Sequence, residues 1–589
     1  MKHVSFYREK YPRPQFVRDS FLDLNGEWKF EFDDKNIGKK EKWFIQHTYS
    51  QTIVVPYSYQ TPASGIGDAT RHDVIWYEKE VDELTLRGSQ LENDRVLIHF
   101  EGVDFQAELW VNGEYAGAHE GGYTRFSFDI TDYLQEGNNR ITLRVEDSFD
   151  TAQPRGKQRW LAESFACFYV ETNGIWKSVW VETVSSRRID TIKIVPEFDR
   201  DCALFSYELA GDCKGLSLRT NVTFGEIKIF SSEEKVNSQR ISFSRNLVSD
   251  AHFFKVCYWT PYCPSLYEVC SELICAGEVI DRVRSYFGMR KIDCDGGQFT
   301  INNVPEYFKG ILDQGYWADT HLTPPDGESL LKDIILTKQL GFNAIRKHQK
   351  IEDERFYYYC DVAGVYATCE MPSNYEFTRK GCEWFSREWM DVVHQLSNHP
   401  SVICWVPFNE SWGVYQIYSN QRQQDFTRGI TALTRALDGD KRPVISNDGW
   451  EHTDSDIIGL HNYAGSGEEL SSMVEELDRV LNDQKVGNLL PRRSFANCAV
   501  YQEQPIIMSE YGGIAFECGE GWGYGKLAQN EEEFLSRVKE LTEAIRGMKR
   551  LCGYCYTQLT DVQQEVNGLM TVDREYKADP KRLAEIFSK

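Results

Sequence analysis

Long hydrophobic runs and net positive charge are both missing from this sequence of 589 residues. No stretch approaches the ~20 apolar residues that a membrane-spanning helix needs, and the N-terminal MKHVSFYREKYPRPQF lacks the apolar core of a secretion signal. The 66 Lys and Arg are outnumbered by 90 Asp and Glu, and the net charge of −24 argues against a nucleic-acid or membrane partner. We therefore expect a cytoplasmic protein with neither partner.

Grouped cysteines are missing as well, although the sequence contains 16 Cys. They are scattered singly, which suits reduced thiols in the cytoplasm better than a disulfide framework. Cys552 and Cys555 form a CxxC inside the strand-like GYCYTQL, where an offset of three places them on opposite faces. We expect core thiols there rather than a zinc or redox site, and we predict no metal and no cofactor.

Apolar and aromatic residues are abundant. Hydrophobic residues make up 41% of the chain and aromatic residues 13%, so a large packed core is expected and disorder is not. The 15 Trp and 31 Tyr exceed what a core alone requires and fit surfaces that stack on sugars, although large β domains are often rich in aromatics. The length predicts about three or four domains.

The first half of the chain has the pattern of β domains. Short alternating strands are separated by turn signals, as in sandwiches and barrels. One β unit closes after GIWKSVWVETV and a second after RSYFGMRKI, so we predict domains at residues 1–185, 186–292 and 293–589. The expected strands include Gly26–Phe32, Arg95–Val103, Ala107–Gly117 and Asn139–Asp147.

In the last of these regions, strands alternate with helices. Eight such units match a (β/α)₈ barrel, whose usual size is ~250 residues. A doubly wound open sheet is the competing fold, but it would carry a Gly-rich phosphate turn after its first strand, and FKGILDQG is not one. The expected strands are Tyr307–Leu312, Phe342–Arg346, Val365–Glu370, Val402–Phe408, Val444–Ser446, Ile457–Leu460, Ile506–Ser509 and Gly553–Thr557.

Acidic residues close several of these strands. Glu410 follows the apolar VICWVPF of the fourth strand, and Glu510 follows PIIMS of the seventh. Glu370 and Asp313 close the third and the first. Because the C-terminal ends of barrel strands form the face where active sites lie, these acids converge on one rim. An Asn-Glu or a Ser-Glu-Tyr alone is more often a loop feature, but two at equivalent strand ends favour a functional site.

Two carboxylates that face each other across a cleft can take opposite roles. One stays protonated as an acid while the other stays ionised as a nucleophile or base. Retaining glycosidases need such a pair ~5–5.5 Å apart, and inverting ones ~6.5–9.5 Å apart. The neutral Asn409 beside Glu410 can donate a hydrogen bond to a sugar hydroxyl without adding a competing charge.

These motifs resemble glycoside hydrolase family 2, which contains β-galactosidases, β-glucuronidases and β-mannosidases. NHPSVICWVPFNESWG (398–413) and IIMSEYGG (506–513) are similar to its acid/base and nucleophile motifs. LNGEWKFEF, ELWVNGEYAGAHEGGYTRFSFDIT and GIWKSVWVE resemble its N-terminal sugar-binding domain, and YFGMRKI resembles the exit from its middle domain. The resemblance covers nearly the whole chain. It implies a jelly-roll sandwich, an immunoglobulin-like β-sandwich and a C-terminal (β/α)₈ TIM barrel.

The resemblance also implies roles for individual residues. Glu410 would be the general acid/base, and Glu510 the nucleophile that forms a glycosyl-enzyme, with net retention. Asn409 would hydrogen-bond the sugar 2-hydroxyl, Arg346 would hold the nucleophile ionised, and Tyr463 matches the tyrosine near the nucleophile. The other substrate-binding candidates are Asp313, at a first-strand position that often holds sugar hydroxyls, and Trp450 and Tyr556, as weaker candidates for pocket walls.

The second-strand motif departs from the family pattern. Arg-x-Ser-His-Tyr-Pro appears here as RKHQKI, which gathers Arg346, Lys347, His348 and Lys350 at the expected mouth of the cleft. A solvated basic loop and a site that recognises an anionic sugar are equally good interpretations of this cluster. We therefore include His348 and Lys350 among the substrate-binding candidates.

A second departure lies near the C-terminus. β-Glucuronidases carry an Asn-x-Lys pair that binds the uronate carboxylate, whereas this chain has Glu565 and Asn567 at the corresponding places. The missing lysine argues against an ordinary β-glucuronidase. A typical β-galactosidase is also disfavoured, because its sugar-contacting histidine is replaced by Gln349 and the chain is short.

Three functions remain open. The first is a retaining exo-β-glycosidase that hydrolyses terminal β-galactosides or related galacturonides and glucuronides. The second is the same fold acting on a β-mannoside or an arabinoside, and the third is a catalytically silent carbohydrate-binding protein. The intact Glu410 and Glu510 favour an enzyme. We expect a carbohydrate or glycoconjugate substrate, a homo-oligomer (dimer or tetramer), and a loop, Ser64–Val74, that restricts the pocket to chain ends.

Overall fold

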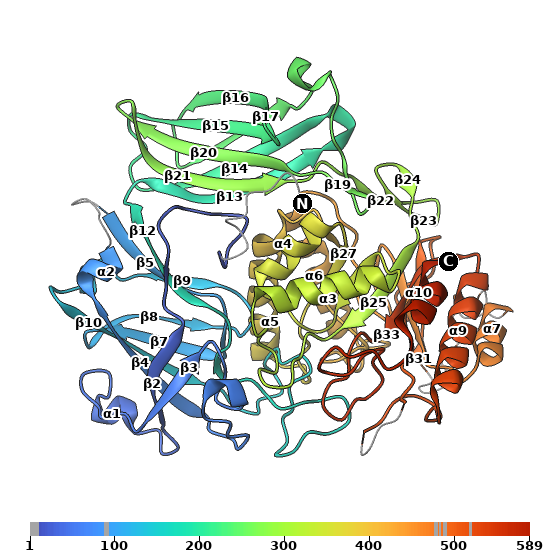
Figure 1. The fold of residues 1–589 in the computed structure, drawn as a ribbon. Coiled ribbons are helices and arrows are strands. Elements are labelled where there is room, and N and C mark those ends of the chain that lie inside the picture. Colours follow the sequence, from blue (N-terminus) through green and yellow to red (C-terminus); the bar gives the residue numbers. More distant parts are fainter. Residues whose placement is uncertain are drawn as a thin grey trace.

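The computed structural model of this chain describes residues 11–87, 94–475, 477, 481, 485–486, 492–516 and 521–589. Residues 1–10 of the N-terminal segment discussed above lie outside this part. Figure 1 shows two β sandwiches, in blue and green, beside a domain of parallel strands and helices coloured yellow to red. Among the described residues, no helix combines the length and the apolarity that crossing a membrane would require.

The first sandwich consists of a six-stranded and a four-stranded antiparallel sheet. Apolar side chains of both sheets, such as Trp28, Tyr77, Ile98 and Val181, form its core. In the order of their pairing, the strands are β3 (Gln51–Val55), β2 (Gly26–Phe32), β4 (Val74–Asp82), β10 (Asn138–Glu146), β7 (Gln106–Val111) and β8 (Glu114–Glu120), and then β1 (Leu22–Asp23), β12 (Val179–Ser185), β5 (Asp94–Phe100) and β9 (Phe126–Asp129). The smaller elements are β6 (Val103–Asp104), β11 (Gly174–Ile175), α1 (Gly38–Glu41) and α2 (Glu83–Arg87).

The second sandwich packs a three-stranded sheet on a four-stranded one. Alternate residues of β14 are buried, as expected for a strand with one face toward a core. The strands are β13 (Arg188–Glu197), β14 (Cys202–Ala210) and β17 (Arg240–Asn246), and β16 (Ile227–Lys235), β15 (Leu216–Phe224), β20 (Tyr267–Cys275) and β21 (Glu278–Phe287). Short ribbons lead to the third domain: β18 (Trp259–Thr260), β19 (Cys263–Pro264), β22 (Ile292–Asp295), β23 (Gln298–Ile301) and β24 (Val304–Pro305).

The third domain is built on a sheet of seven parallel strands. The strand order places the first expected strand between the second and the last, as barrel closure requires. The neighbours in order are β28 (Val402–Val406), β27 (Tyr366–Glu370), β26 (Ala344–Lys347), β25 (Phe308–Asp313), β33 (Leu551–Thr557), β32 (Ile506–Gly512) and β29 (Ile458–Asn462). All five residues of β27, β28 and β29 are buried, which explains their nearly continuous apolar sequences.

The expected fifth strand does not form a regular ladder. Val444 makes a single parallel bridge to Trp405, and Asp448 makes another to Asn409. The residues between these bridges follow the edge of β28 without continuous pairing. The segment still occupies the fifth position, and it supports the chain at Asn409 and Glu410.

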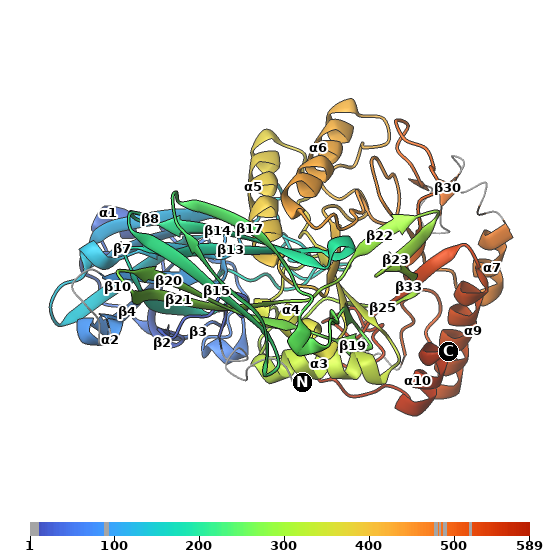
Figure 2. The same cartoon turned by 90° about the horizontal axis from the view of Figure 1, so that it is seen from above.

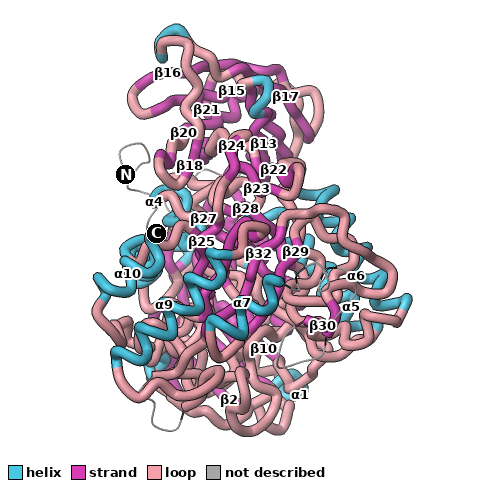
Figure 3. The backbone as a smooth tube through the Cα atoms, turned by 90° about the vertical axis from the view of Figure 1, so that its right-hand side faces the viewer, coloured by secondary structure: helices cyan, strands magenta, loops and turns pink. Residues whose placement is uncertain are grey.

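Helices cover the outside of the sheet. Figure 2 shows α3 and α4 on one side and α5 and α6 on another, and Figure 3 shows α7 and α9 in front of β32 and β29. Asp326, Asp353 and Asn530 cap α3, α4 and α9 with side-chain hydrogen bonds to backbone N–H groups. The helices are α3 (Gly327–Gln339), α4 (Glu354–Ala363), α5 (Arg379–Leu396), α6 (Gln421–Asp438), α7 (Gly467–Glu475), α9 (Glu531–Gly547) and α10 (Pro580–Ser588), with a short ribbon of β30 (Lys485–Val486) and β31 (Arg492–Arg493).

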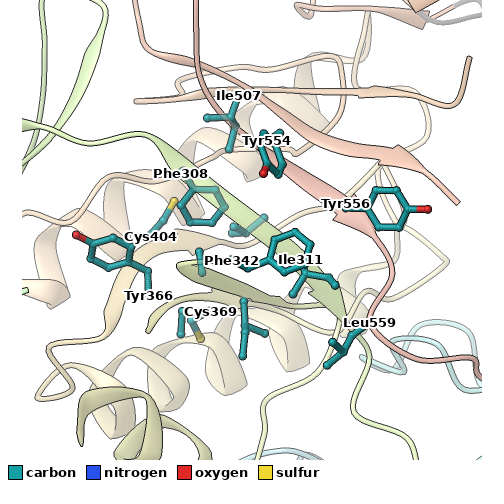
Figure 4. Close-up of a cluster of buried hydrophobic side chains, with 14 of the residues drawn as sticks. Phe308, Ile311, Phe342, Tyr366, Cys369, Cys404, Ile507, Tyr554, Tyr556 and Leu559 are labelled. Carbon is teal, nitrogen blue, oxygen red and sulfur yellow. The ribbon is translucent and has the colours of Figure 1, made fainter. Parts of the chain in front are cut away.

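The core of the third domain lies both inside the sheet and between sheet and helices. Figure 4 shows Phe308 and Ile311 of β25 among buried side chains of the neighbouring strands. Cys552 and Cys555 both lie on β33 as free thiols, with Cys555 buried and Cys552 half-buried. This tightly packed interior holds the strand ends in fixed positions, and the candidate site is built on those ends.

Candidate active site

Glu410 and Glu510 meet at the C-terminal ends of the barrel strands. Glu410 lies in the loop after β28, and Glu510 lies within β32. A carboxylate oxygen of each lies within 4.8 Å of the other. The Glu410 side chain is 21% exposed and that of Glu510 only 6%, so Glu410 faces the entrance. This spacing is close to that of a retaining pair and far below that of an inverting pair.

The backbone that carries Glu410 is held in an unusual conformation. Glu410 and Ser411 have φ values of 52° and 59°, in the left-handed region that costs a non-glycine residue about 1–2 kcal/mol. Contacts with the fifth segment stabilise it: the Glu410 N–H donates to Asp448 O at 2.9 Å. The Ser411 N–H donates to Asn447 Oδ1 at 2.9 Å, and its hydroxyl donates to Glu451 at 2.7 Å. The irregular fifth segment thus fixes the direction of the Glu410 side chain.

Arg346, at the end of β26, connects the site residues. Its Nη1 lies 3.1 Å from Glu510 Oε1 and 2.8 Å from Asp448 Oδ2. Its Nε donates to Glu370 Oε2 at 2.8 Å, and its Nη2 donates to Asn409 Oδ1 at 2.8 Å. Burial opposes the charge, but Asp448, Glu370 and Glu510 raise the pKa of Arg346 well above its ordinary value. The guanidinium therefore stays charged and orients two strand ends at once.

Asn409 is left with a free donor. Since its Oδ1 accepts from Arg346, its Nδ2 must point away from Arg346. Nδ2 is buried and has no hydrogen-bond acceptor among the described residues. The indole N–H groups of Trp412 and Trp450 are buried without an acceptor in the same described part. Buried donors without partners are costly, so these three groups are suited to bind a polar ligand.

Tyr463, just after β29, contacts the more buried carboxylate. Its hydroxyl donates to Glu510 Oε2 at 2.5 Å and lies 3.1 Å from Thr557 Oγ1 of β33. Its ring stacks on Tyr524, with centroids 3.5 Å apart. Burial and the charge of Glu510 raise the pKa of Tyr463 well above its ordinary value, so the phenol stays protonated as a donor.

His461 is a site residue that the sequence analysis missed. Its Nδ1 lies 2.8 Å from Glu410 Oε1 and 3.5 Å from Glu510 Oε2, and its Nε2 lies 3.7 Å from Asp448. Burial alone would lower its pKa, but Glu510, Asp448 and Glu410 raise it to about 10. The sequence does contain a signal for His461. On a strand, it shares a face with Tyr463 two residues later, in GLHNY.

The imidazolium acts on Glu410 in turn. Burial raises the pKa of Glu410, but hydrogen bonding and charge from His461, with smaller effects of Lys157 and His348, lower it below its usual value. The ligand atoms of Glu410, His461 and Glu510 lie within 4.8 Å of one another, a spacing that could hold a metal ion. Hydrogen bonds among these groups occupy part of the same set of lone pairs.

Lys350 does not reach the site, which corrects the interpretation of RKHQKI as one basic cluster at the mouth. Its ammonium donates to Gly315 O and Leu322 O, each at 2.7 Å, and pairs with Glu352 at 2.6 Å. The side chain is 1% exposed. Three acceptors use all three of its protons, so none is left for a sugar.

Asp313 is likewise committed to internal partners. Its Oδ2 accepts from Lys347 at 2.6 Å, and its Oδ1 accepts from the Gly315 N–H at 2.8 Å. Lys347 also lies 3.2 Å from Glu352. Asp313, Lys347, Lys350 and Glu352 form one buried group of paired charges, which we call the closed network. Asp313 supports the first strand end and is not in contact with the Glu410–Glu510 pair.

The remaining two predicted residues, His348 and Tyr556, have different surroundings. His348 Nδ1 lies 3.0 Å from Glu370 Oε1, so this histidine supports Arg346 through their shared partner. Tyr556 packs on Phe587 of α10, with ring centroids 5.4 Å apart, and so lies on the helix side of β33. Successive residues of a strand face opposite sides, so Thr557, not Tyr556, faces Tyr463.

A segment of the first sandwich crosses the mouth of the barrel. We call residues 152–173, between β10 and β11, the strap. At one end the N–H groups of Arg155 and Gly156 donate to Ser373 O, after β27, at 2.8 and 3.0 Å. At the other end Ala166 O accepts from Trp522 Nε1 at 3.0 Å, and Phe168 O accepts from Gln564 at 2.9 Å. The strap therefore bridges loops that follow β27, β32 and β33.

The strap, rather than the expected loop Ser64–Val74, makes these contacts with the site. That loop touches the strap, because Arg159 donates to Ala69 O at 2.6 Å. Beneath the strap, Glu565 accepts from Tyr169, and its Oε1 accepts from Asn567 at 3.0 Å. The places expected to correspond to the uronate-binding pair are thus occupied by residues that bind each other.

Three family models match consecutive parts of the chain. "Glycosyl hydrolases family 2, sugar binding domain" matches residues 21–181, and "Glycosyl hydrolases family 2" matches residues 187–290. "Glycosyl hydrolases family 2, TIM barrel domain" matches residues 292–587. Together they follow the order of the two sandwiches and the barrel, in agreement with the predicted fold class.

Curated relatives are similar at modest identity. A β-galactosidase of Thermoanaerobacter pseudethanolicus is 26% identical over 420 residues, which are 68% of this chain and 52% of that protein. A putative β-glucuronidase of Formosa agariphila is 26% identical over 74% of this chain and 52% of its own length. The chain thus spans about half the length of these two relatives. Human β-glucuronidase is 26% identical over 85% of this chain and 79% of its own.

Solved structures share the fold over the full length. A Bifidobacterium dentium β-glucuronidase complexed with coumarin-3-O-glucuronide has a TM-score of 0.79 at 20% identity and covers 98% of both chains. A Ruminococcus gnavus β-glucuronidase in complex with D-glucuronic acid has a TM-score of 0.79 at 18% identity and covers 100% of both chains. At these identities the likeness extends to the arrangement of domains and strands.

Proposed function

The chain belongs to glycosyl hydrolase family 2, and from this we propose that it is a retaining exo-β-glycosidase acting on terminal β-galactosides or related β-hexuronides. The enzyme class and a carbohydrate substrate follow from the family. The choice of sugar and the roles of individual residues are our proposals. The observation that carries them is the approach of the Glu410 and Glu510 carboxylates to within 4.8 Å.

In the first step Glu410 donates its proton to the glycosidic oxygen while Glu510 attacks the anomeric carbon. The bond from that carbon to the leaving group breaks, and a covalent glycosyl-enzyme forms on Glu510. Arg346 and Tyr463 hold the attacking carboxylate by contacts of 3.1 and 2.5 Å. The Nδ2 of Asn409 donates to the 2-hydroxyl, where a hydrogen bond strengthens as the transition state develops.

In the second step a water molecule attacks the same carbon from the side of Glu410. Glu410 now takes the proton of the water, and the bond to Glu510 breaks, which returns the sugar with its original configuration. The change of role has an electrostatic cause. Esterification removes the negative charge of Glu510. Without a like charge beside it, the pKa of Glu410 falls, so Glu410 gives up its proton and becomes the base.

The entrance supports an exo mode of action. The strap contacts the loops after β27, β32 and β33, and a segment in this position would limit the room for a chain that continues past the reacting sugar. The Glu410 side chain is partly exposed, which suits an acid that protonates a departing group. Both features favour a single terminal sugar in the pocket.

The mechanism is tested by removing each carboxylate. Glu510→Ala and Glu410→Gln are each expected to reduce turnover of an activated aryl glycoside by at least about 10⁴-fold, while thermal unfolding changes little. Glu328→Gln, at an exposed position in the first turn of α3, is the matched control and should retain full activity. Wild-type activity in either site variant would remove the two-carboxylate mechanism, and an α-configured first product, seen by NMR, would remove retention.

The sugar is identified by a panel of aryl glycosides. The values of kcat/KM are compared for β-galactoside, β-galacturonide, β-glucuronide, β-mannoside and α-arabinoside substrates. A galactoside or hexuronide should give the highest value. A mannoside or arabinoside in first place would contradict the proposed substrate class but leave the two-carboxylate mechanism standing.

A further inference from the structure

We propose that Lys157, on the strap, binds a negatively charged substituent of the sugar, a carboxylate or a sulfate ester, and so selects acidic over neutral glycones. The proposal rests on the glycosidase function inferred above and names the residue that sets its substrate class. The two sources of charge share one chemistry, since either offers anionic oxygens to an ammonium group. Lys350, which the sequence suggested for this role, is excluded by its internal partners.

Lys157 is a buried cation with spare protons. The residue is 9% exposed, and its Nζ donates to the Cys167 sulfur at 3.4 Å. A thiol is a weak acceptor, and within the described residues the remaining contact of this ammonium is with the Phe168 ring, whose centroid lies 5.8 Å away and takes no proton. Two of its three protons are therefore left for a ligand or water. A buried ammonium with protons to spare is suited to bind an anion that completes its set of hydrogen bonds.

Ring contacts place Lys157 beside the candidate site: its Nζ lies over Phe168, whose ring centroid is 5.8 Å from that of Trp412, two residues after Glu410. Burial opposes its charge, but Cys167 and then Glu565, Glu410 and Glu510 raise the pKa of Lys157 above its ordinary value. The ammonium thus stays charged at neutral pH and senses both carboxylates of the proposed mechanism. Glu565 acts on it more strongly than Glu410 or Glu510 does. Tyr169 links the two residues, because its N–H donates to the Lys157 carbonyl and its hydroxyl donates to Glu565.

The strap is built to hold Lys157 in place. Its carbonyl accepts from the Tyr169 N–H at 2.9 Å, and the next residue, Gln158, donates to Asp104 at 2.7 Å in the body of the sandwich. The preceding Gly156 has a φ of 61°, and a Cβ there would lie 2.4 Å from Gln349 O of the barrel. Lys157 is therefore carried by a segment fixed to both domains.

A simpler role for Lys157 is to balance the negative charge of the pocket. Glu565 is the nearest candidate for such balance, because its partners Tyr169 and Asn567 are neutral donors that leave its charge in place. The two roles also predict different measurements. A charge that only balances the pocket acts on every substrate alike, whereas a charge that binds a substituent acts on acidic substrates selectively.

The test compares aryl β-galacturonide, β-glucuronide and 6-sulfo-β-galactoside with the neutral β-galactoside in the full-length enzyme. In wild type at least one acidic substrate should exceed the neutral one in kcat/KM, and the identity of that substrate distinguishes carboxylate from sulfate. In Lys157→Met the ratio of acidic to neutral kcat/KM should fall at least 30-fold. Lys157→Arg, which keeps the charge, should restore much of it.

The matched control is Lys177→Met. Lys177 is also a buried lysine of the first sandwich, but its Nζ donates to Tyr123 O at 2.8 Å and Glu352 O at 3.4 Å. We expect this variant to unfold at a lower temperature with an unchanged substrate ratio. Thermal unfolding of Lys157→Met should stay near that of wild type, because its removal deprives no oxygen of a donor.

Each contrary result has a definite meaning. An unchanged ratio in Lys157→Met, with all rates reduced alike, overturns the proposal in favour of charge balance. A wild-type preference for the neutral galactoside also overturns it, and this needs no variant. If wild type cleaves no glycoside at all, the proposed function fails instead. Calorimetric binding of free galacturonate, glucuronate and galactose 6-sulfate to wild type and Lys157→Met then decides the role of Lys157 alone.

Discussion

Two groups of buried charge lie at the same end of the barrel and are built in opposite ways. In the closed network, Asp313, Lys347, Lys350 and Glu352 satisfy one another and nearby carbonyl groups. Around Glu410 and Glu510, by contrast, Asn409, Trp412 and Trp450 retain donors without acceptors in the described part of the chain. Full pairing indicates a group that holds the fold, and spare hydrogen-bonding capacity indicates a group that meets a ligand.

Both groups draw on the same short stretch of sequence. Arg346 and His348 contact Glu370, whereas Lys347 and Lys350 contact Glu352. Strand alternation separates the first three residues, and Gln349, with a φ of 47°, turns the chain so that Lys350 rejoins Lys347. Adjacent cations therefore differ in function because of the face on which they lie.

The largest effect on stability should come from breaking the closed network. Lys350→Met leaves Gly315 O and Leu322 O without their donor and leaves Glu352 with one cation. We expect a loss of about 3–5 kcal/mol in the free energy of unfolding, measured by chemical denaturation. Lys157→Met is the control and should lose far less. A stable Lys350→Met enzyme with altered sugar preference would reverse our assignment of the two lysines.

Asn409→Ala should act on activity instead. Loss of its free Nδ2 donor is expected to lower kcat by about 10²–10³-fold, the usual cost of removing a preorganised donor from a transition state. A 2-deoxy glycoside provides the control, because it has no 2-hydroxyl to bind. The deficit of the variant should largely disappear with this substrate. An equal deficit with both substrates would mean that Asn409 acts only by orienting Arg346.

Tyr463 contacts Glu510 and Tyr556 packs on α10, so variants of the two tyrosines compare the site with its surroundings. Tyr463→Phe removes the 2.5 Å hydrogen bond to Glu510 and should lower kcat about 10- to 100-fold. Tyr556→Phe removes a hydroxyl on the other side of β33 and should change kcat less than about threefold. Equal effects of the two variants would show that the orientation of β33 described above is wrong.

The smallest expected change is a shift in pH dependence. His461 has a pKa raised to about 10, so the imidazolium persists through the usual assay range and lowers the pKa of Glu410. In His461→Gln this influence is lost, and the pKa of Glu410 should rise. The basic limb of the kcat/KM profile should then move to higher pH, because the acid form of Glu410 survives longer. A shift to lower pH would contradict this account.

The fold was largely predictable from sequence because its signals are local. Apolar runs such as VICWVPF and IIMS marked β28 and β32, and the carboxylates that follow them marked the rim. The fifth strand was placed correctly as a segment but not as a ladder, since it pairs only at Val444 and Asp448. Boundaries and strand types of this kind depend on hydrogen bonds that residue patterns do not encode.

The site was predictable only in part. Glu410, Glu510, Asn409, Arg346 and Tyr463 come together as the motifs suggested. The wrong predictions concern Lys350, Asp313 and Tyr556. Whether these side chains reach the site depends on which face of a strand turns inward. The contribution of the strap could not be read from composition, because the contacts that join it to the barrel, with Ser373, Trp522 and Gln564, are distant along the chain.

The strap also assigns the two proposed tasks, cleavage of the bond and selection of the sugar, to different domains. In the mechanism that we propose, bond cleavage depends on the ends of parallel strands, while the strap that crosses them belongs to a different structural unit. A chimera that received another sandwich would therefore keep its reaction and inherit a new substrate preference. The same arrangement means that substitutions in the first sandwich can change the surroundings of the site without altering the strand ends.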